Sequence, residues 1–218
     1  MNPAALFDPV AAAIVVGGTA LATYLRCGTT SCRCAAAALG QLWGKRFDAA
    51  GTKAELAVQV RAIHQDGLLR AKPHHFADRE FDEATEALIG RRSVSALLAA
   101  HEAHKARRVE ASNRASATLA QASELAPVFG LAGTLVSLSQ LPIDGLARGA
   151  YAGAIGMAVL TTLYGLLLAN LVLAPLARVV ERAAAAEERA RQMIVDWLAS
   201  QVASEIPQRR APAYEAAA

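Results

Sequence analysis

Pro127, Gly130, Thr134 and Ser137 share one face of a predicted helix inside an uncharged stretch of the sequence. They fall at positions i, i+3, i+7 and i+10, which is the spacing that places side chains on one side of a helix. If this helix lies in lipid, no water is present to satisfy a hydroxyl group, so its polar face turns toward protein or a water-filled cavity. The pattern indicates that Thr134 and Ser137 line a candidate path for a polar or charged solute.

A second uncharged stretch repeats the arrangement. Ala158, Thr162 and Gly165 lie on one side of the predicted helix, and Thr161 adjoins them. Two stretches with matching hydroxyl faces favour a pathway. The alternative is ordinary helix packing, in which each Thr hydroxyl bonds back to a carbonyl in the preceding turn of its own helix.

Three long segments of the chain carry no charged side chain and no His. They are residues 9–25, 125–143 and 149–177, which contain 17, 19 and 29 residues. A hydrocarbon core of about 30 Å needs roughly 20 helical residues, so the second and third segments qualify directly and the first is marginal. Hydrophobic residues make up 54% of the chain and the mean hydropathy is +0.27. These features predict an all-α integral membrane bundle with three transmembrane helices, one within residues 1–26 and two within 125–177.

The distribution of Lys and Arg predicts the topology. The connection from residue 26 to 124 holds 15 Lys and Arg against 11 Asp and Glu, and the region after Ala177 adds further Arg residues. The positive-inside rule places both in the cytoplasm, and the N-terminus outside a bacterial inner membrane. Because the basic residues flank the spans, they do not indicate a nucleic-acid partner. The first span could also be a signal peptide, but Asp8 and the lack of a preceding basic residue argue against it.

The two cytoplasmic regions are predicted to be helical extensions of the membrane helices. Within 27–124, helical spacing predicts helices over 53–69 and 78–89, the second capped by Gly90. A break is expected at 72–75 and one helix from 93 into the second span. Residues 178–206 continue the third span, and 207–218 are predicted to be disordered.

Cysteine and histidine residues give no sign of a metal site or of catalysis. Cys27, Cys32 and Cys34 are spaced C-x4-C-x-C, which is not the usual paired zinc spacing, and they are expected to be free thiols. The sequence shows no nucleotide-binding loop and no hydrolase motif. We therefore expect no catalytic residue and no cofactor. The remaining candidates are four histidines, which we expect to lie solvated on the surface: His74, His75, His101 and His104.

Four sequence blocks resemble the MotA/TolQ/ExbB ion-channel family, and the MotA branch in particular. They are FDPVAAAIVVGGTALA at 7–22, GLL at 67–69, APVFGLAGTLVSL at 126–138 and MAVLTTLYGLLLANLVLAPLA at 157–177. The resemblance implies a homo-pentamer around two copies of a single-span partner like MotB, ExbD or TolR. That partner would supply the membrane Asp that carries protons or sodium. This agrees with the spans themselves, which hold no ionisable side chain of the kind that ion relays need.

The resemblance also implies roles for individual residues. Thr134 and Thr162 match pore hydroxyl positions, and Tyr164 and Asn170 belong to the third block. Pro127 matches the proline that opens the first pore helix. Pro175 also removes a backbone donor and can kink its helix.

The layout departs from the MotA branch in one respect. MotA proteins usually have four spans, whereas this sequence has three, which is the ExbB and TolQ layout. The partner could therefore belong to a flagellar stator or to a system that energises the outer membrane. Arg79 and Glu80 are candidates for contact with a rotor or envelope protein. A membrane scaffold that assembles through the same small-residue faces without conducting ions is the alternative function.

Overall fold

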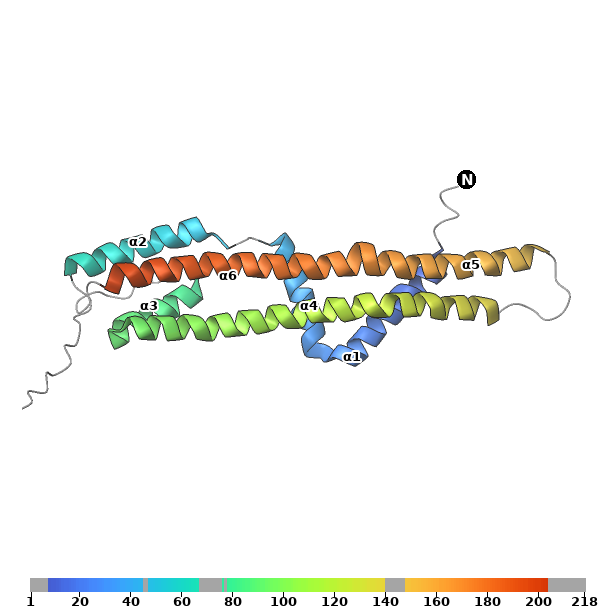
Figure 1. Cartoon of the computed structure of the whole chain (residues 1–218), viewed down its shortest axis with the longest axis horizontal. Coiled ribbons are helices and arrows are strands. Elements are labelled where there is room, and N and C mark those ends of the chain that lie inside the picture. Colours follow the sequence, from blue (N-terminus) through green and yellow to red (C-terminus); the bar gives the residue numbers. More distant parts are fainter. Residues whose placement is uncertain (1–7, 45–46, 67–75, 77, 140–147, 204–218) are drawn as a thin grey trace, which may run out of the picture. The chain divides into compact units, whose positions relative to one another are not determined.

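A computed structural model describes residues 8–44, 47–66, 76, 78–139 and 148–203, and the described residues form helices without any strand. The predicted break at 72–75 with His74 and His75, the GLL block, the loop with Asp144 and the tail 207–218 lie outside these residues. In chain order the elements are α1 (Pro9–Trp43), α2 (Ala49–Asp66), α3 (Arg79–Arg91), α4 (Val94–Ser139), α5 (Arg148–Leu167), the π-helix η2 (Leu168–Leu173) and α6 (Ala174–Ala203) (Figure 1).

The chain divides into two compact units. Unit 1 comprises Met1–Arg46 and Val109–Ala184, and unit 2 comprises Phe47–Arg108 and Ala185–Ala218. Helices α4 and α6 each contribute one part to unit 1 and another to unit 2. Among the residues that the structure describes, three helical stretches are long and apolar enough to cross a membrane: Pro9–Trp43, Val94–Ser139 and Tyr151–Ala203. The predicted fold class and the predicted continuity of the second and third spans with further helix are confirmed.

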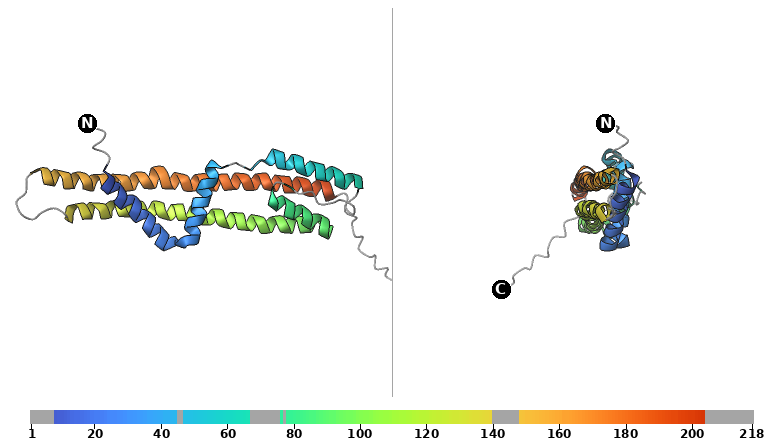
Figure 2. Two further views of the ribbon diagram at one scale, coloured as in Figure 1. Left: turned by 180° about the vertical axis from the view of Figure 1, so that it is seen from behind. Right: turned by 90° about the vertical axis from the view of Figure 1, so that its right-hand side faces the viewer.

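In unit 1, α1 starts from a well-capped end and bends in its middle. The Asp8 carboxylate accepts hydrogen bonds from the backbone N–H groups of Val10 and Ala11 at 2.8 and 3.2 Å, and Pro9 occupies the first turn, where its missing N–H costs nothing. Gly28 has φ +77°, a backbone conformation that a residue with a Cβ rarely adopts. The bend visible in Figure 2 therefore falls at Gly28.

The part of α1 beyond the bend packs on two other helices of unit 1. Ala35 is buried there with Ala115 and Leu119 of α4 and with Ala177 and Val180 of α6. In the sequence, Ala115 and Leu119 precede the uncharged segment 125–143, whereas Ala177 ends the segment 149–177 and Val180 follows it. The Cys27 thiol contributes a polar contact to the same region, 3.0 Å from the Gln121 side-chain oxygen.

Helices α4 and α5 run side by side in unit 1 because glycines allow their backbones to approach closely. A Cβ built on Gly165 would lie 2.7 Å from the Ala126 carbonyl oxygen and 3.0 Å from the Gly130 Cα. Small residues permit such contacts in membranes, where apolar side chains gain little by leaving lipid. We call this contact the α4–α5 seam; it continues to Ser123, whose hydroxyl lies 3.5 Å from the Ala169 carbonyl oxygen.

Unit 2 has an apolar core of its own. Helix α3 begins at Arg79 after the capping carboxylate of Asp78, and it continues through the predicted cap Gly90 to Arg91. The left-handed residue that ends it is Arg92, with φ 52°. The prediction that Gly90 caps this helix is therefore wrong. The core is built from α2, α3, α4 and α6 together with Phe76, and its buried members are Leu56, Val60, Phe76, Phe81, Ala84, Leu88, Leu97, Ile194, Val195, Leu198 and Val202.

Candidate functional site

Part of the predicted hydroxyl face lies within the α4–α5 seam. Thr161 is fully buried, and its side chain faces Gly133 of α4, where a Cβ would lie 2.8 Å from Thr161 Cβ. The Thr161 and Ser137 hydroxyls donate to carbonyl oxygens of their own helices, at 2.9 Å to Ala158 and 2.8 Å to Gly133. The seam therefore brings together Gly130, Thr161 and Gly165, and two further residues singled out by sequence, Ser137 and Ala158, are buried.

Thr134 and Thr162 lie at the edge of this seam and keep part of their surface exposed. The Thr134 hydroxyl donates to the Leu131 carbonyl oxygen at 2.6 Å, and the Thr162 hydroxyl donates to that of Ala158 at 3.3 Å. A hydroxyl has one hydrogen and two acceptor lone pairs. Both oxygens can therefore still accept a hydrogen bond or coordinate a cation.

Two contacts mark the side of the seam on which α1 packs. Gly18 of α1 lies so close to Phe129 of α4 that a Cβ would overlap the ring. The Asp8 backbone N–H donates to the Tyr164 hydroxyl of α5 at 3.0 Å. With about 100° of rotation per residue, Thr134 points about 140° away from Phe129, and Thr162 about 160° away from Tyr164. Both threonines therefore border the seam on the side opposite α1, which we call the open side.

The other predicted residues have distinct surroundings. Pro127 lies inside α4, which continues as a helix through it. Pro175 lies in the first turn of α6, directly after η2, and a π-helix within a longer helix frequently marks a functional site. Asn170 lies within η2 with an exposed side chain. The role of these residues as pore lining, kink or gate stays a prediction, as does that of the two threonines.

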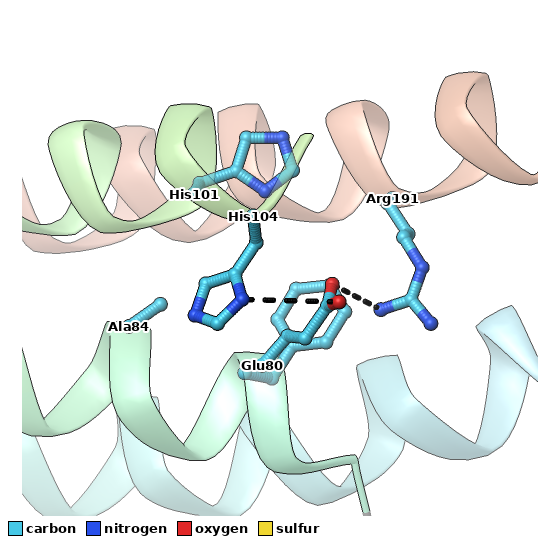
Figure 3. A pocket seen from close by; sticks show the side chains of 6 residues that line it. Glu80, Ala84, His101, His104 and Arg191 are labelled. Carbon is cyan, nitrogen blue, oxygen red and sulfur yellow. Dashed lines mark ion pairs between the residues drawn. The ribbon is translucent and has the colours of Figure 1, made fainter. Parts of the chain in front are cut away.

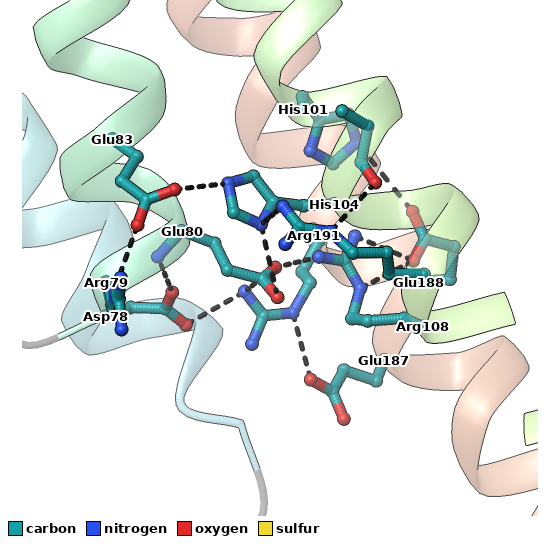
Figure 4. A network of polar contacts seen from close by, with 12 residues as sticks. Asp78, Arg79, Glu80, Glu83, His101, His104, Arg108, Glu187, Glu188 and Arg191 are labelled. Carbon is teal, nitrogen blue, oxygen red and sulfur yellow. Dashed lines mark hydrogen bonds and ion pairs between the residues drawn. The ribbon is translucent and has the colours of Figure 1, made fainter. Parts of the chain in front are cut away.

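Unit 2 carries a dense set of ion pairs that joins α3, α4 and α6 (Figure 4). Arg191 of α6 lies 2.8 Å from the Asp78 carboxylate, 3.4 Å from Glu80 and 2.9 Å from Glu187. Arg108 of α4 pairs with Glu80 and, at 2.9 Å, with Glu188. Glu80 thus accepts two arginines from two other helices. Burial of charges is tolerated where each charge has such partners.

His101 and His104 belong to this network and are only 5% and 9% exposed, so the expectation that they are solvated is wrong. His104 Nε2 lies 2.9 Å from the Glu83 carboxylate, and His101 Nε2 lies 3.3 Å from the Gln192 side-chain oxygen. Figure 3 shows the two rings with Glu80 and Arg191 around a hollow that encloses no space for a water molecule. This part of unit 2 is therefore a packed polar core and offers no ligand cavity.

The two candidate rotor contacts differ in availability. Arg79 is 87% exposed in its side chain, and its one ion pair with a described residue is with Glu83, one turn further along α3. Its hydrogen bond, followed by smaller effects of its charge and of His104, lowers the pKa of Glu83 below the ordinary value of 4.5. Glu80 is instead enclosed by Arg108 and Arg191.

Sequence reasoning missed the contacts that join distant segments. Gly133 stood inside a quoted block, but its role facing Thr161 depends on the register of two helices. Arg191 was noted only as one of several basic residues after the third span. The i, i+3 spacing of His101 and His104 places both on one helical face, but it does not tell whether that face meets a core or solvent.

Comparisons with known proteins agree with this geometry. Residues 72–193 match the model of the MotA/TolQ/ExbB proton channel family. Motility protein A of Borreliella burgdorferi is 33% identical over 78 residues, a match that covers 36% of this chain and 30% of that relative. The chain thus spans less than a third of the length of that relative.

Two solved structures share the fold. The structure of C. jejuni MotAB matches with a TM-score of 0.79 at 17% identity, over 92% of this chain and 81% of that one. The flagellar MotAB stator complex from Bacillus subtilis matches with a TM-score of 0.80 at 18% identity, over 93% and 81%. At these identities the likeness establishes the fold, and the match of the family model, which covers more than half of the sequence, establishes the relationship. The chain belongs to the MotA/TolQ/ExbB proton channel family.

Proposed function

We propose that this protein is the ion-conducting subunit of an inner-membrane, ion-driven complex, and that Thr134 and Thr162 face the permeating proton or sodium ion. The observation that carries the proposal is that both threonines border the α4–α5 seam on its open side. Helix α1 covers the other side. Polar groups on a lipid-level face need a polar neighbour, and the open side is where an ion path would supply it.

The spans hold no charged side chain of their own between residues 149 and 177 or between 125 and 143. We infer that the carboxylate that carries the ion belongs to a single-span partner like MotB, ExbD or TolR. The partner would pass along the open side, within reach of the two hydroxyls. Several copies of this chain, five by the family resemblance, would surround it, with α1 toward the lipid.

The orientation follows from the charges that flank the spans. We propose that unit 2 lies in the cytoplasm, because the long connection and the region after the third span carry the basic excess. Unit 2 would then present the exposed Arg79 to a rotor or envelope protein. Its buried ion pairs would hold α3 in place against the force exerted at that contact.

The test uses Thr162→Val in the complex purified from its native host through a tag on this chain. Valine keeps the shape and removes the hydroxyl. Native mass spectrometry counts the subunits and identifies the partner, and the complex in liposomes is then given a proton gradient or a sodium gradient. We expect the variant to assemble normally and to carry severalfold less ion flux than the unchanged protein.

Thr161→Val is the matched control, because the same chemical change is made one residue away, inside the seam. Flux should fall less in Thr161→Val than in Thr162→Val. Equal flux in the Thr162 variant and the unchanged complex would reject the role of this hydroxyl. A complex that assembles without any single-span partner and carries no flux would be a scaffold.

A further inference from the structure

Glu124 and Asn170 are two exposed polar side chains whose hydrogen-bonding capacity is not used within the described part of the chain. Glu124 of α4 makes no ion pair or hydrogen bond there. Asn170 of η2 donates one amide N–H to the Leu166 carbonyl oxygen at 3.0 Å. Its second N–H and its side-chain oxygen have no partner among the described residues.

The two side chains lie at the same depth on neighbouring helices. Ser123 directly precedes Glu124, and Ala169 directly precedes Asn170. The Ser123 hydroxyl lies 3.5 Å from the Ala169 carbonyl oxygen, so these preceding residues meet across the seam. Glu124 directly precedes the uncharged segment 125–143, and Asn170 lies within the segment 149–177, seven residues before its end. There, a polar group without a partner is costly because lipid offers no hydrogen bonds.

The helical phase directs both side chains to the open side of the seam but away from each other. One residue step in an α-helix rotates a side chain by about 100°, and the step from Ala169 to Asn170 in the π-helix η2 is smaller; on antiparallel helices these rotations carry both side chains toward the same side. Glu124 lies about 140° from Phe129, which marks the α1 side of α4. Within one copy the two side chains diverge. Between two copies placed side by side with their open sides facing inward, they converge.

We propose that Asn170 of one copy donates its free amide N–H to the Glu124 carboxylate of the next copy, as a repeated contact around the ring. The proposal rests on the proposed function, because it requires copies arranged around a central path. The contact is heterologous, so each copy gives a donor on one edge and an acceptor on the other. A hydrogen bond to an ionised carboxylate is about twice as strong as a neutral one, which suits a contact at the lipid boundary.

A second copy of this chain fits these groups better than the single-span partner. Each copy carries one unused donor and one unused acceptor, so a second copy complements the first without any further group. A contact between copies satisfies the donor and the acceptor in all of them. The η2 segment supports the same reading, because it places Asn170 on the exposed surface while the preceding Ala169 stays buried in the seam.

The experiment is cysteine cross-linking in native membranes, with Cys27, Cys32 and Cys34 first replaced by Ala. Glu124→Cys and Asn170→Cys are placed on two separately tagged copies that are expressed together. A short bifunctional thiol reagent then joins them only across different chains. Leu163→Cys replaces Asn170→Cys in the matched control, because Leu163 is also exposed on α5 but lies seven residues, or about 10 Å, away along the helix.

We expect the Glu124 and Asn170 pair to give a product carrying both tags at least tenfold more abundantly than the Glu124 and Leu163 pair. The double variant Glu124→Cys, Asn170→Cys in one chain should give a ladder that ends at the ring size. Equal yields in the two pairs, within complexes that mass spectrometry shows to be rings, overturn this contact and leave the proposed function standing. A chain that purifies as a monomer overturns both.

Discussion

Unit 1 and unit 2 share two helices, yet the helices within each unit are held together by different interactions. In unit 1, α4 meets α5 through Gly130, Gly133 and Gly165, with hydroxyls that bond within their own helices. In unit 2, α4 meets α3 and α6 through an apolar core and ion pairs centred on Glu80. In lipid, association depends on close backbone approach, whereas in water apolar side chains drive it and ion pairs orient it. One continuous helix therefore packs in two different ways along its length.

The largest effect is expected when the α4–α5 seam is filled with a bulky side chain. Gly165→Leu would place a side chain against the Ala126 carbonyl oxygen and the Gly130 Cα, both backbone atoms that cannot move aside independently. We expect the variant to lose the assembled complex altogether, as measured by size-exclusion chromatography in mild detergent. Gly153→Leu is the control, since a Cβ there meets nothing within 4 Å. Assembly of the Gly165 variant at the level of the control would contradict the role of close approach.

The corresponding change in unit 2 removes a cation from the ion-pair network. Arg191→Ala leaves Asp78 and Glu187 without this partner, and it leaves Glu80 with only Arg108. We expect α3 to open more readily by about 2 kcal/mol, below the range for a fully buried pair because Glu80 is partly exposed. Hydrogen exchange of the α3 amides, read by mass spectrometry, measures this opening.

Arg79→Ala is the control for that experiment, because it breaks an exposed pair on the same helix. Such pairs contribute roughly 0–1 kcal/mol. If the α3 amides exchange equally fast in the two variants, the buried network does not hold the helix. A large effect on ion flux from Arg191→Ala without any change in exchange would instead assign Arg191 a role outside unit 2.

The sequence predicted the parts of the structure that depend on local pattern. Helix α4 extends from unit 2 into the second span because nothing between residues 94 and 126 breaks it, and α5, η2 and α6 continue as one helical run. The bend at Gly28 could not be predicted, because a glycine adopts positive φ only where packing demands it. The burial of His101 and His104 was missed for a related reason. Their partners, Glu83 and Gln192, lie on other helices.

For the candidate site, too, the sequence predicted some features and missed others. The helical spacing of Thr134, Ser137 and Thr162 was evident from sequence. Which of these hydroxyls lies inside the seam and which at its edge depends on the register of α4 against α5, and that register is set by Gly130 and Gly165. A single helix therefore predicts a polar face, but only the pair of helices shows which part of that face is open.

The smallest expected effect concerns the surface of unit 2, where ion pairs face solvent. The pKa of Glu83 is lowered, chiefly by the hydrogen bond from Arg79 at 2.8 Å. Because the folded-state pKa is depressed, the stabilisation from this carboxylate is present above its ordinary value of 4.5 and is lost as the pH falls through the lower, folded-state value. Arg79→Gln should raise the pKa of Glu83 toward the ordinary value, as read from its carboxyl carbon-13 shift.

Arg91→Gln removes the same charge elsewhere on α3 and should leave the titration of Glu83 where it was. His104→Gln removes the smaller contributions of the histidine and should raise the pKa of Glu83 less than Arg79→Gln does. A larger shift from His104→Gln would show that the buried network, and not the exposed arginine, controls this carboxylate. The charge state of this surface carboxylate would then depend on the polar core of unit 2. In unit 1, by contrast, the open side carries hydroxyls that donate to carbonyl oxygens of their own helices.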